Sequence, residues 1–190
     1  MQTLLAVSRF FDRVNRAVAR VAGWLFFVLA GVVVVDVVTR KFGYQIPQFG
    51  STRLQELEGH LHAALFALWF GYAYAKNAHV RIDIALGRAG PRALAKLEFF
   101  GCVFLALPFA LVAVYFAVDY ALTSFRHNEA SVSASGLPYL FIPKTVLAIG
   151  VILLALAVVS MLLRAAVFLW GPAHLREQAA ITVYRMGEKP

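Results

Sequence analysis

Four long apolar stretches, separated by polar segments, dominate the pattern of the chain. A helix needs about 20 mostly apolar residues to cross the hydrocarbon core of a bilayer. The stretches that reach this length cover residues 21–38, 54–75, 99–122 and 139–163. The pattern therefore predicts an all-α integral membrane bundle of four transmembrane helices. We expect one membrane domain over residues 1–172 and a cytoplasmic tail over residues 173–190.

The second stretch is the least apolar of the four. Its uncharged part covers only residues 63–75, so a helix that crosses the bilayer there must include the polar residues before it. These residues are Glu56, Glu58, His60 and His62. We expect them to lie at the outer end of the second helix.

The segment before the first span has a helical period of its own. One face carries Leu4, Val7, Phe11, Val14 and Val18, and the other carries Arg9, Asp12, Arg13 and Arg16. This pattern is typical of an N-terminal amphipathic helix that lies in the membrane interface. The alternative is that the same residues extend the first span beyond the bilayer.

The distribution of Lys and Arg predicts the orientation, because these residues accumulate in the short cytoplasmic loops of membrane proteins. The N-terminal segment, the loop between the second and third spans and the tail hold 13 of the 18 Lys and Arg residues. Both termini are therefore predicted to be cytoplasmic. We attribute the net charge of +8 to contact with anionic membrane lipids and expect no nucleic-acid partner.

The middle of every span lacks ionisable residues. No Asp, Glu, Lys, Arg or His occurs within residues 21–35, 63–75, 99–118 or 145–163. An ionisable group at the bilayer centre costs at least about 2.5–3.5 kcal/mol, so it is retained mainly where ions or substrates pass. We therefore expect that the chain does not conduct a solute by itself.

Charged residues gather instead at the predicted outer ends of the spans. We call this set the polar collar: Asp36, Arg40, Arg53, Glu56, Glu58, Asp119 and Arg126. One interpretation is an ordinary interface of paired and snorkelling side chains. The other is a surface that docks a periplasmic partner.

Small residues recur every four positions on the second span. We call this set the small-residue ridge: Gly59, Ala63, Ala67, Gly71 and Ala75. The third span has a similar alanine series, from Ala106 to Ala121. Close approach along small residues drives helix association in lipid. The ridge is thus predicted to contact the third span or to dock another subunit, and Gly71→Leu is predicted to disrupt assembly.

The sequence offers no convincing catalytic, cofactor or metal site. Among the spans only the second carries histidines, whereas a bis-histidine haem needs ligands on two facing helices. Glu58 and His62 share a helical face but lack a third metal ligand. The single cysteine, Cys102, excludes an intrachain disulfide. A four-helix redox subunit and an unrelated membrane assembly factor stay open as alternatives.

Three motifs resemble a known family. Residues 77–83 (NAHVRID) are similar to the N-x-H-[VI]-x-[VI]-D signature of the small, DctQ-like membrane subunit of tripartite ATP-independent periplasmic (TRAP) transporters. Residues 135–138 (SGLP) and 143–144 (PK) resemble that family's S-x-G-L-P and P-K patterns, although Ser133 could also be the aligned serine. The matching residues are Asn77, His79, Arg81, Asp83, Ser135, Gly136, Leu137, Pro138, Pro143 and Lys144.

The resemblance implies a bacterial inner-membrane complex. In that family a large permease subunit holds the substrate and sodium sites, and a periplasmic substrate-binding protein delivers an organic acid. The small subunit enlarges the static scaffold. The resemblance thus implies these two proteins and membrane lipids as partners, no enzymatic activity, and motif residues that shape the subunit itself.

Overall fold

The computed structural model describes residues 1–44, 46, 49–76, 78 and 90–179, and this part of the chain is all-helical. Beyond the helices it holds one isolated bridge, between Ile46 and Phe49. The helices are α1 (Gln2–Lys41), α2 (Ser51–Ala75), α3 (Pro91–Gly101), α4 (Leu107–Arg126), α5 (Phe141–Trp170) and α6 (Ala173–Ala179), with a π-helical turn, η1 (Cys102–Ala106), between α3 and α4. The predicted all-α class is confirmed.

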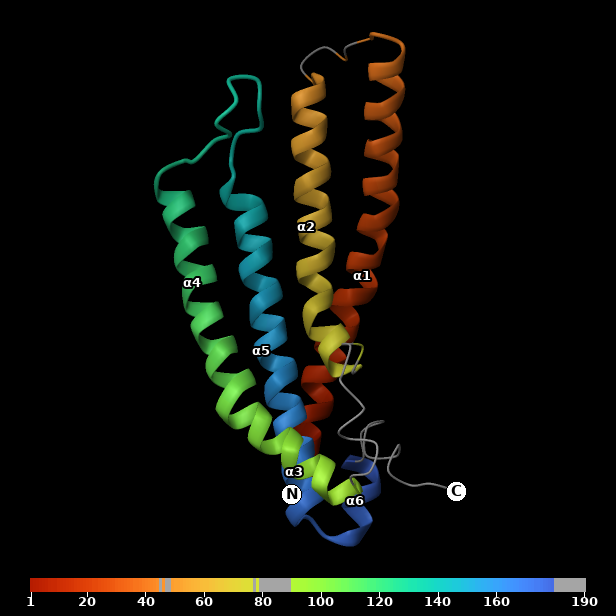
Figure 1. Cartoon of the computed structure of the whole chain (residues 1–190), viewed down its shortest axis with the longest axis vertical. Coiled ribbons are helices and arrows are strands. Elements are labelled where there is room, and N and C mark those ends of the chain that lie inside the picture. Colours follow the sequence, from red (N-terminus) through yellow and green to blue (C-terminus); the bar gives the residue numbers. More distant parts are fainter. Residues whose placement is uncertain (45, 47–48, 77, 79–89, 180–190) are drawn as a thin grey trace.

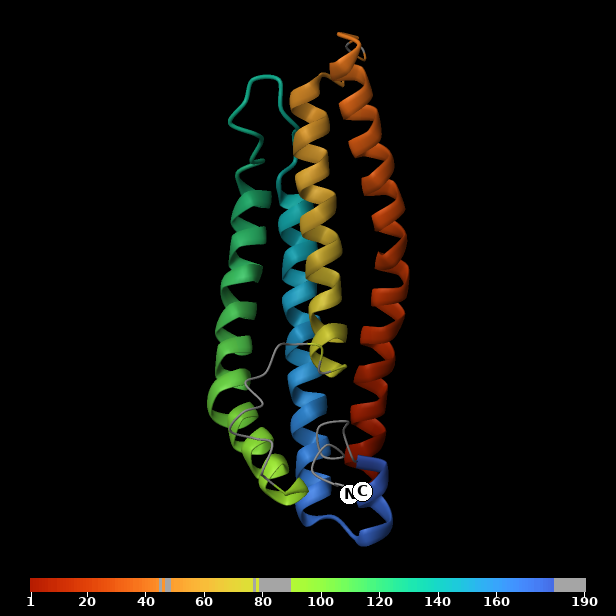
Figure 2. The same ribbon diagram turned by 45° about the vertical axis from the view of Figure 1, so that its right-hand side comes forward.

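The long helices stand side by side in the order α1, α2, α5, α4 (Figure 1). Helix α2 packs against both α1 and α5, and α4 packs against α5. We call the end with the 127–140 connection the loop end, and the end with the N-terminus, α3 and α6 the terminal end. At the loop end α1 and α2 extend beyond α4 and α5 (Figures 1 and 2).

Three of the described helical stretches are long and apolar enough to cross a membrane. They are Gln2–Lys41, Pro91–Arg126 and Phe141–Trp170. Helix α2 lies where the second span is predicted, but its polar first half gives it a lower hydropathy than the other three. Membrane crossing by α2 therefore stays a prediction.

Helix α1 continues without a break through the junction between the predicted surface helix and the first span. It is 40 residues long, which matches the alternative in which the N-terminal residues extend the first helix. Its buried face also differs from the predicted apolar face, since Val7 is exposed and Val14 is only half-buried, while Ser8 and Asn15 are buried. Small and polar residues face inward because they let α5 approach closely and can bond across the interface.

A bend separates α3 from α4 (Figure 2). It coincides with η1, which directly precedes Leu107 and Pro108. Proline has no N–H to donate, and its ring clashes with the carbonyl four residues earlier, so the helix widens there. The bend carries α3 against α5, where Leu94 and Ala95 cluster with Met161.

The small-residue ridge of α2 divides into two halves. Ala67 and Gly71 are buried, whereas Gly59 and Ala63 are exposed. The buried half packs closely on α5, because a Cβ added at Gly150 would lie only 2.4 Å from the Ala67 carbonyl oxygen. Helix α5 lies between α2 and the alanine series of α4 (Figure 1), so α5 is the partner of the ridge within the bundle.

The predicted tail begins with an ordered element. Helix α6 places Leu175 and Ala179 in one apolar cluster with Leu5 of α1 and Val167 of α5. The two ends of the described chain are thereby packed together at the terminal end.

Candidate functional site

Glu56 of α2 holds the connection between α4 and α5. The hydroxyl of Ser131 donates a hydrogen bond to Oε1 of Glu56, and the backbone N–H of Leu137 donates to Oε2 at 2.6 Å. The Leu137 carbonyl in turn accepts the backbone N–H of Ser131 at 3.0 Å. One carboxylate therefore binds two points of the loop that are already bonded to each other.

Arg53 lies almost one helical turn before Glu56 and binds the same loop. Its Nε donates to the carbonyl oxygens of Ser135 and Gly136, each at 3.2 Å. Glu56 and Arg53 thus bind the segment 131–137 through the Ser131 hydroxyl and three backbone groups. We call this arrangement the loop clamp.

Gly136 is required by the clamp for steric reasons. A Cβ added there would lie 2.3 Å from Cβ of Ser131 and 2.7 Å from Oε1 of Glu56. The SGLP motif therefore places its glycine and leucine against Glu56 of another helix.

A second ion pair closes the base of the loop. Lys144, in the first turn of α5 beside Pro143, pairs with Glu129 and lies 3.9 Å above the ring of Tyr120. Hydrogen bonds from Lys144 and from Ser124 hold the pKa of Glu129 below its usual value. The sequence identified Lys144 but not Glu129. A loop has no periodic pattern from which the direction of a side chain can be predicted.

Asp36 joins α1 to α2 at the loop end. It is fully buried, forms an i, i+4 ion pair with Arg40 at 2.5 Å, and accepts a hydrogen bond from Ser51 at 3.4 Å. Asp119 and Arg126 are exposed on α4. The polar collar therefore includes separate structural contacts, and the structure does not gather it into one site.

A buried polar network links α1 to α5 near the terminal end. The hydroxyls of Ser8 and Ser160 lie 2.9 Å apart, and the Ser160 hydroxyl is 2.6 Å from Oδ1 of Asp12. Arg164 donates to the Ser8 hydroxyl at 2.9 Å and forms an ion pair with Asp12. We call these four residues the α1–α5 network.

Sequence reasoning missed this network because it assigned Asp12 to a water-facing surface. The sequence does contain one indication, because polar residues have the same spacing on both helices. Ser8 and Asp12 are one turn apart on α1, as Ser160 and Arg164 are on α5. Polar side chains at matching one-turn spacing on two helices can bond across a membrane bundle.

A comparison with protein families decides the identity of the chain. Residues 29–168 match the family model described as tripartite ATP-independent periplasmic transporters, DctQ component. This chain belongs to the DctQ family. The DctQ component is the small permease subunit of a TRAP transporter, which makes this DctQ protein a transporter component and a multi-pass inner-membrane protein. The same comparisons find no match among curated proteins or solved structures.

Membership in the DctQ family implies association with a large permease subunit and a periplasmic binding protein. The motif residues Asn77, His79, Arg81 and Asp83 of the DctQ protein lie outside the described residues. Within the described ranges, no group of three or more His, Cys, Asp or Glu side chains could hold a metal ion.

Glu56→Ala is expected to release the loop of this DctQ protein while leaving the helices intact. The substitution removes the two carboxylate oxygens that accept from Ser131 and Leu137, so the Leu137 amide loses its partner and should exchange its hydrogen with solvent faster. Hydrogen–deuterium exchange by mass spectrometry measures this. Gln55→Ala, at an exposed position on the same helix, is the matched control. Equal protection of residues 131–137 in both variants would contradict the clamp.

Proposed function

We propose that this DctQ chain is the non-conducting small permease subunit of a sodium-coupled TRAP transporter for an organic acid. The observation that carries the proposal is the absence of ionisable residues from the middle of every predicted span, in a chain of this family. Substrates and coupling ions need polar groups at membrane depth, and this chain does not offer them. The large permease subunit then carries both.

The packing of the bundle supports a bracing role. The loop clamp fixes one end, the α1–α5 network fixes the other, and close contacts of glycine and alanine fill the space between. Such an arrangement resists bending, because packed interiors are dense and deform little. The subunit therefore stabilises the scaffold of the large permease subunit.

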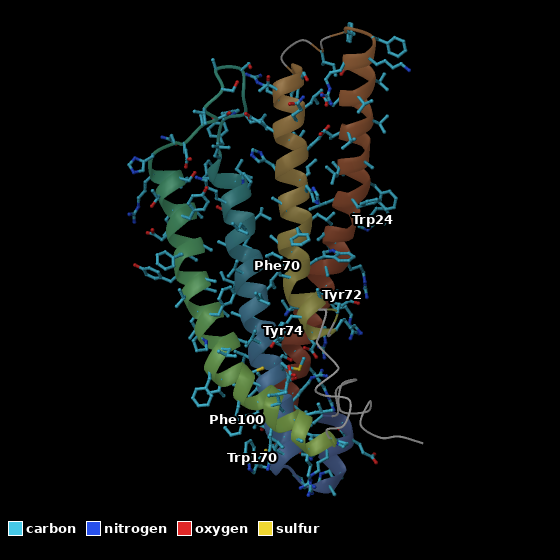
Figure 3. All side chains as sticks on the ribbon, viewed as in Figure 1. Trp24, Phe70, Tyr72, Tyr74, Phe100 and Trp170 are labelled. Atoms are coloured by element: carbon cyan, nitrogen blue, oxygen red, sulfur yellow. The ribbon has the colours of Figure 1, made fainter. Side chains whose placement is uncertain are left out.

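The outer surface of the bundle supports contact with lipid and with another membrane subunit. Figure 3 shows Trp24 projecting from α1 and Phe100 from α3, and these side chains are 69% and 51% exposed. Large apolar surfaces of this kind need an apolar partner. We place the large permease subunit and the membrane lipids there.

The topology completes the proposal. Helix α2 supplies the fourth crossing, both termini are cytoplasmic, and the loop end faces the periplasm. The binding protein then meets the surface of the 127–140 connection, which the clamp presents in one fixed conformation.

Co-expression with the large permease subunit and the binding protein of its transporter tests the proposal. We expect the chain to co-purify with the permease, and uptake of an organic acid into liposomes to require both subunits and a sodium gradient. Liposomes that hold this chain alone should show no uptake. Uptake by the chain alone, or a Soret absorption band in the purified chain, would contradict the proposed function.

A further inference from the structure

The charge-free stretches of the four long helices have midpoints at different heights along the bundle. The stretches are residues 21–35, 63–75, 99–118 and 145–163, and their midpoints fall close to Val28, Trp69, Phe109 and Leu154 respectively. In an upright bundle these midpoints would lie at one height, the centre of the bilayer. Contacts between the helices show that they do not.

The midpoint of α2 lies nearer the terminal end than that of α1. The indole Nε1 of Trp69 donates to the carbonyl oxygen of Ala19 at 3.0 Å. Ala19 precedes Val28, the midpoint of α1, by nine residues. At a rise of 1.5 Å per residue the two midpoints differ in height by about 13 Å.

The midpoint of α5 lies lower still. Gly71 sits between α1 and α5, because a Cβ added there would lie 1.9 Å from Oδ1 of Asn15 and 2.5 Å from the carbonyl oxygen of Leu153. The midpoint of α5 is therefore level with Asn15 of α1. This corresponds to a height difference of about 20 Å from Val28.

The midpoint of α4 is the lowest of the four. Ring contacts of Phe125 with Phe141 at 5.2 Å and of Phe99 with Trp170 at 4.9 Å fix the antiparallel register of the α3–α4 helix and α5. This register brings Phe109 close to the height of Ser160, whose hydroxyl lies 2.9 Å from the hydroxyl of Ser8 of α1. The displacement from Val28 is then about 25–30 Å.

The heights fall in the same order in which the helices stand across the bundle, α1, α2, α5, α4 (Figures 1 and 2). Neighbouring helix axes lie about 8–10 Å apart, and α1 also contacts α5 directly, so the row from α1 to α4 is at most roughly 25–30 Å wide. The charge-free belt therefore runs diagonally over the molecule, at roughly 45° to the plane perpendicular to the helices.

We infer that the hydrocarbon of the bilayer contacts the bundle along this oblique belt, so that the helices cross the membrane with a tilt of roughly 45°. The residues that the belt leaves out support the inference. Arg13, Arg16 and Arg20 are exposed on α1 at heights where α4 and α5 are apolar. Conversely, Val28 is 51% exposed and lies higher on the bundle than Phe109, which is 67% exposed. When the bundle is tilted, the hydrocarbon covers both Val28 and Phe109, and the three arginines lie outside the hydrocarbon.

Depth measurements on the full chain in phosphatidylcholine liposomes test the tilt. In a Cys102→Ala background, single nitroxide labels are attached after Val28→Cys, Phe109→Cys, Val14→Cys or Val112→Cys. Three of these positions are exposed, and Val14 is half-buried. Accessibility to oxygen and to a water-soluble nickel complex then reports the depth of each label.

The two label pairs separate the tilted from the upright orientation. In the tilted bundle, labels at 28 and 109 lie at similar depth in the hydrocarbon, whereas the label at 14 is about 15–20 Å nearer the aqueous phase than the one at 112. An upright bundle reverses this: positions 14 and 112 share one depth, and 28 and 109 differ by about 25 Å. That reversed result would overturn the inference. A label at 28 that neither reagent reaches would also overturn it, because protein and not lipid would then cover α1.

The inference does not depend on the substrate or on sodium coupling. An upright bundle that still co-purifies with the large permease subunit would refute the tilt alone. A tilted bundle that fails to co-purify would refute the proposed function alone.

Discussion

Gly71→Ala is expected to destabilise the bundle by about 3 kcal/mol or more, whereas Gly59→Ala on the same helix should be nearly neutral. A Cβ at Gly71 would meet Asn15 of α1 at 1.9 Å and the backbone carbonyl of Leu153 at 2.5 Å. The Asn15 side chain can move, but the Leu153 backbone can retreat only if α5 shifts. No atom lies within 4 Å of a Cβ at Gly59.

Thermal unfolding of the purified variants in one detergent, followed by circular dichroism, measures the difference. Both substitutions exchange glycine for alanine within α2, so the intrinsic gain in helix propensity is the same and cancels. Gly71→Leu should lower the yield of the complex further, because its larger side chain forces α2 away from both neighbours. Equal melting temperatures for the two alanine variants would refute the close contact.

Arg164→Met is expected to cost about 3 kcal/mol, because it leaves Asp12 without its cationic partner in the bundle. The side chains of Arg164 and Asp12 are only 25% and 18% exposed, so water compensates little for the lost partner. The Ser8 hydroxyl also loses a donor. Arg13→Met removes the same charge from an exposed position of α1 and serves as the control.

A double-mutant cycle separates the ion pair from the packing of the arginine stem. Replacing both partners, with Asp12→Leu and Arg164→Met, should restore much of the stability, because no buried charge is then left alone. Unfolding in the same detergent gives the coupling energy. A double variant as unstable as the sum of its single variants would show that the two residues do not interact.

The positions of the long helices could be predicted because length and apolarity are direct requirements of a bilayer. The α3–η1–α4 bend could not, since Pro108 lies within an apolar run that looks continuous. Periodicity also revealed that α2 has a face of small residues, of which Ala67 and Gly71 are buried. It could not name the partner, because α5 offers small residues of its own, such as Gly150.

The polar contacts were harder to predict than the helices. The ion pair of Asp36 and Arg40 is predictable, because i, i+4 spacing on one helix is local information. The bonds of Glu56 to Leu137 and of Asp12 to Ser160 join residues far apart in the sequence, and no local spacing encodes them. Rules for soluble proteins also mislead here, since they place polar groups toward solvent, whereas polar groups in a membrane bundle often bond inward.

The α1–α5 network has a consequence for biosynthesis. Asp12 and Arg164 are separated by 152 residues, so Asp12 is synthesised long before its partner Arg164. Glu56 likewise emerges before Ser131 and Leu137, which bind it. The first helical hairpin must therefore wait in the translocon or the lipid with two carboxylates unmatched. Only the second hairpin supplies Arg164, Ser131 and Leu137, which bind these two carboxylates. The assembled subunit therefore differs from the first hairpin alone in having both carboxylates bonded.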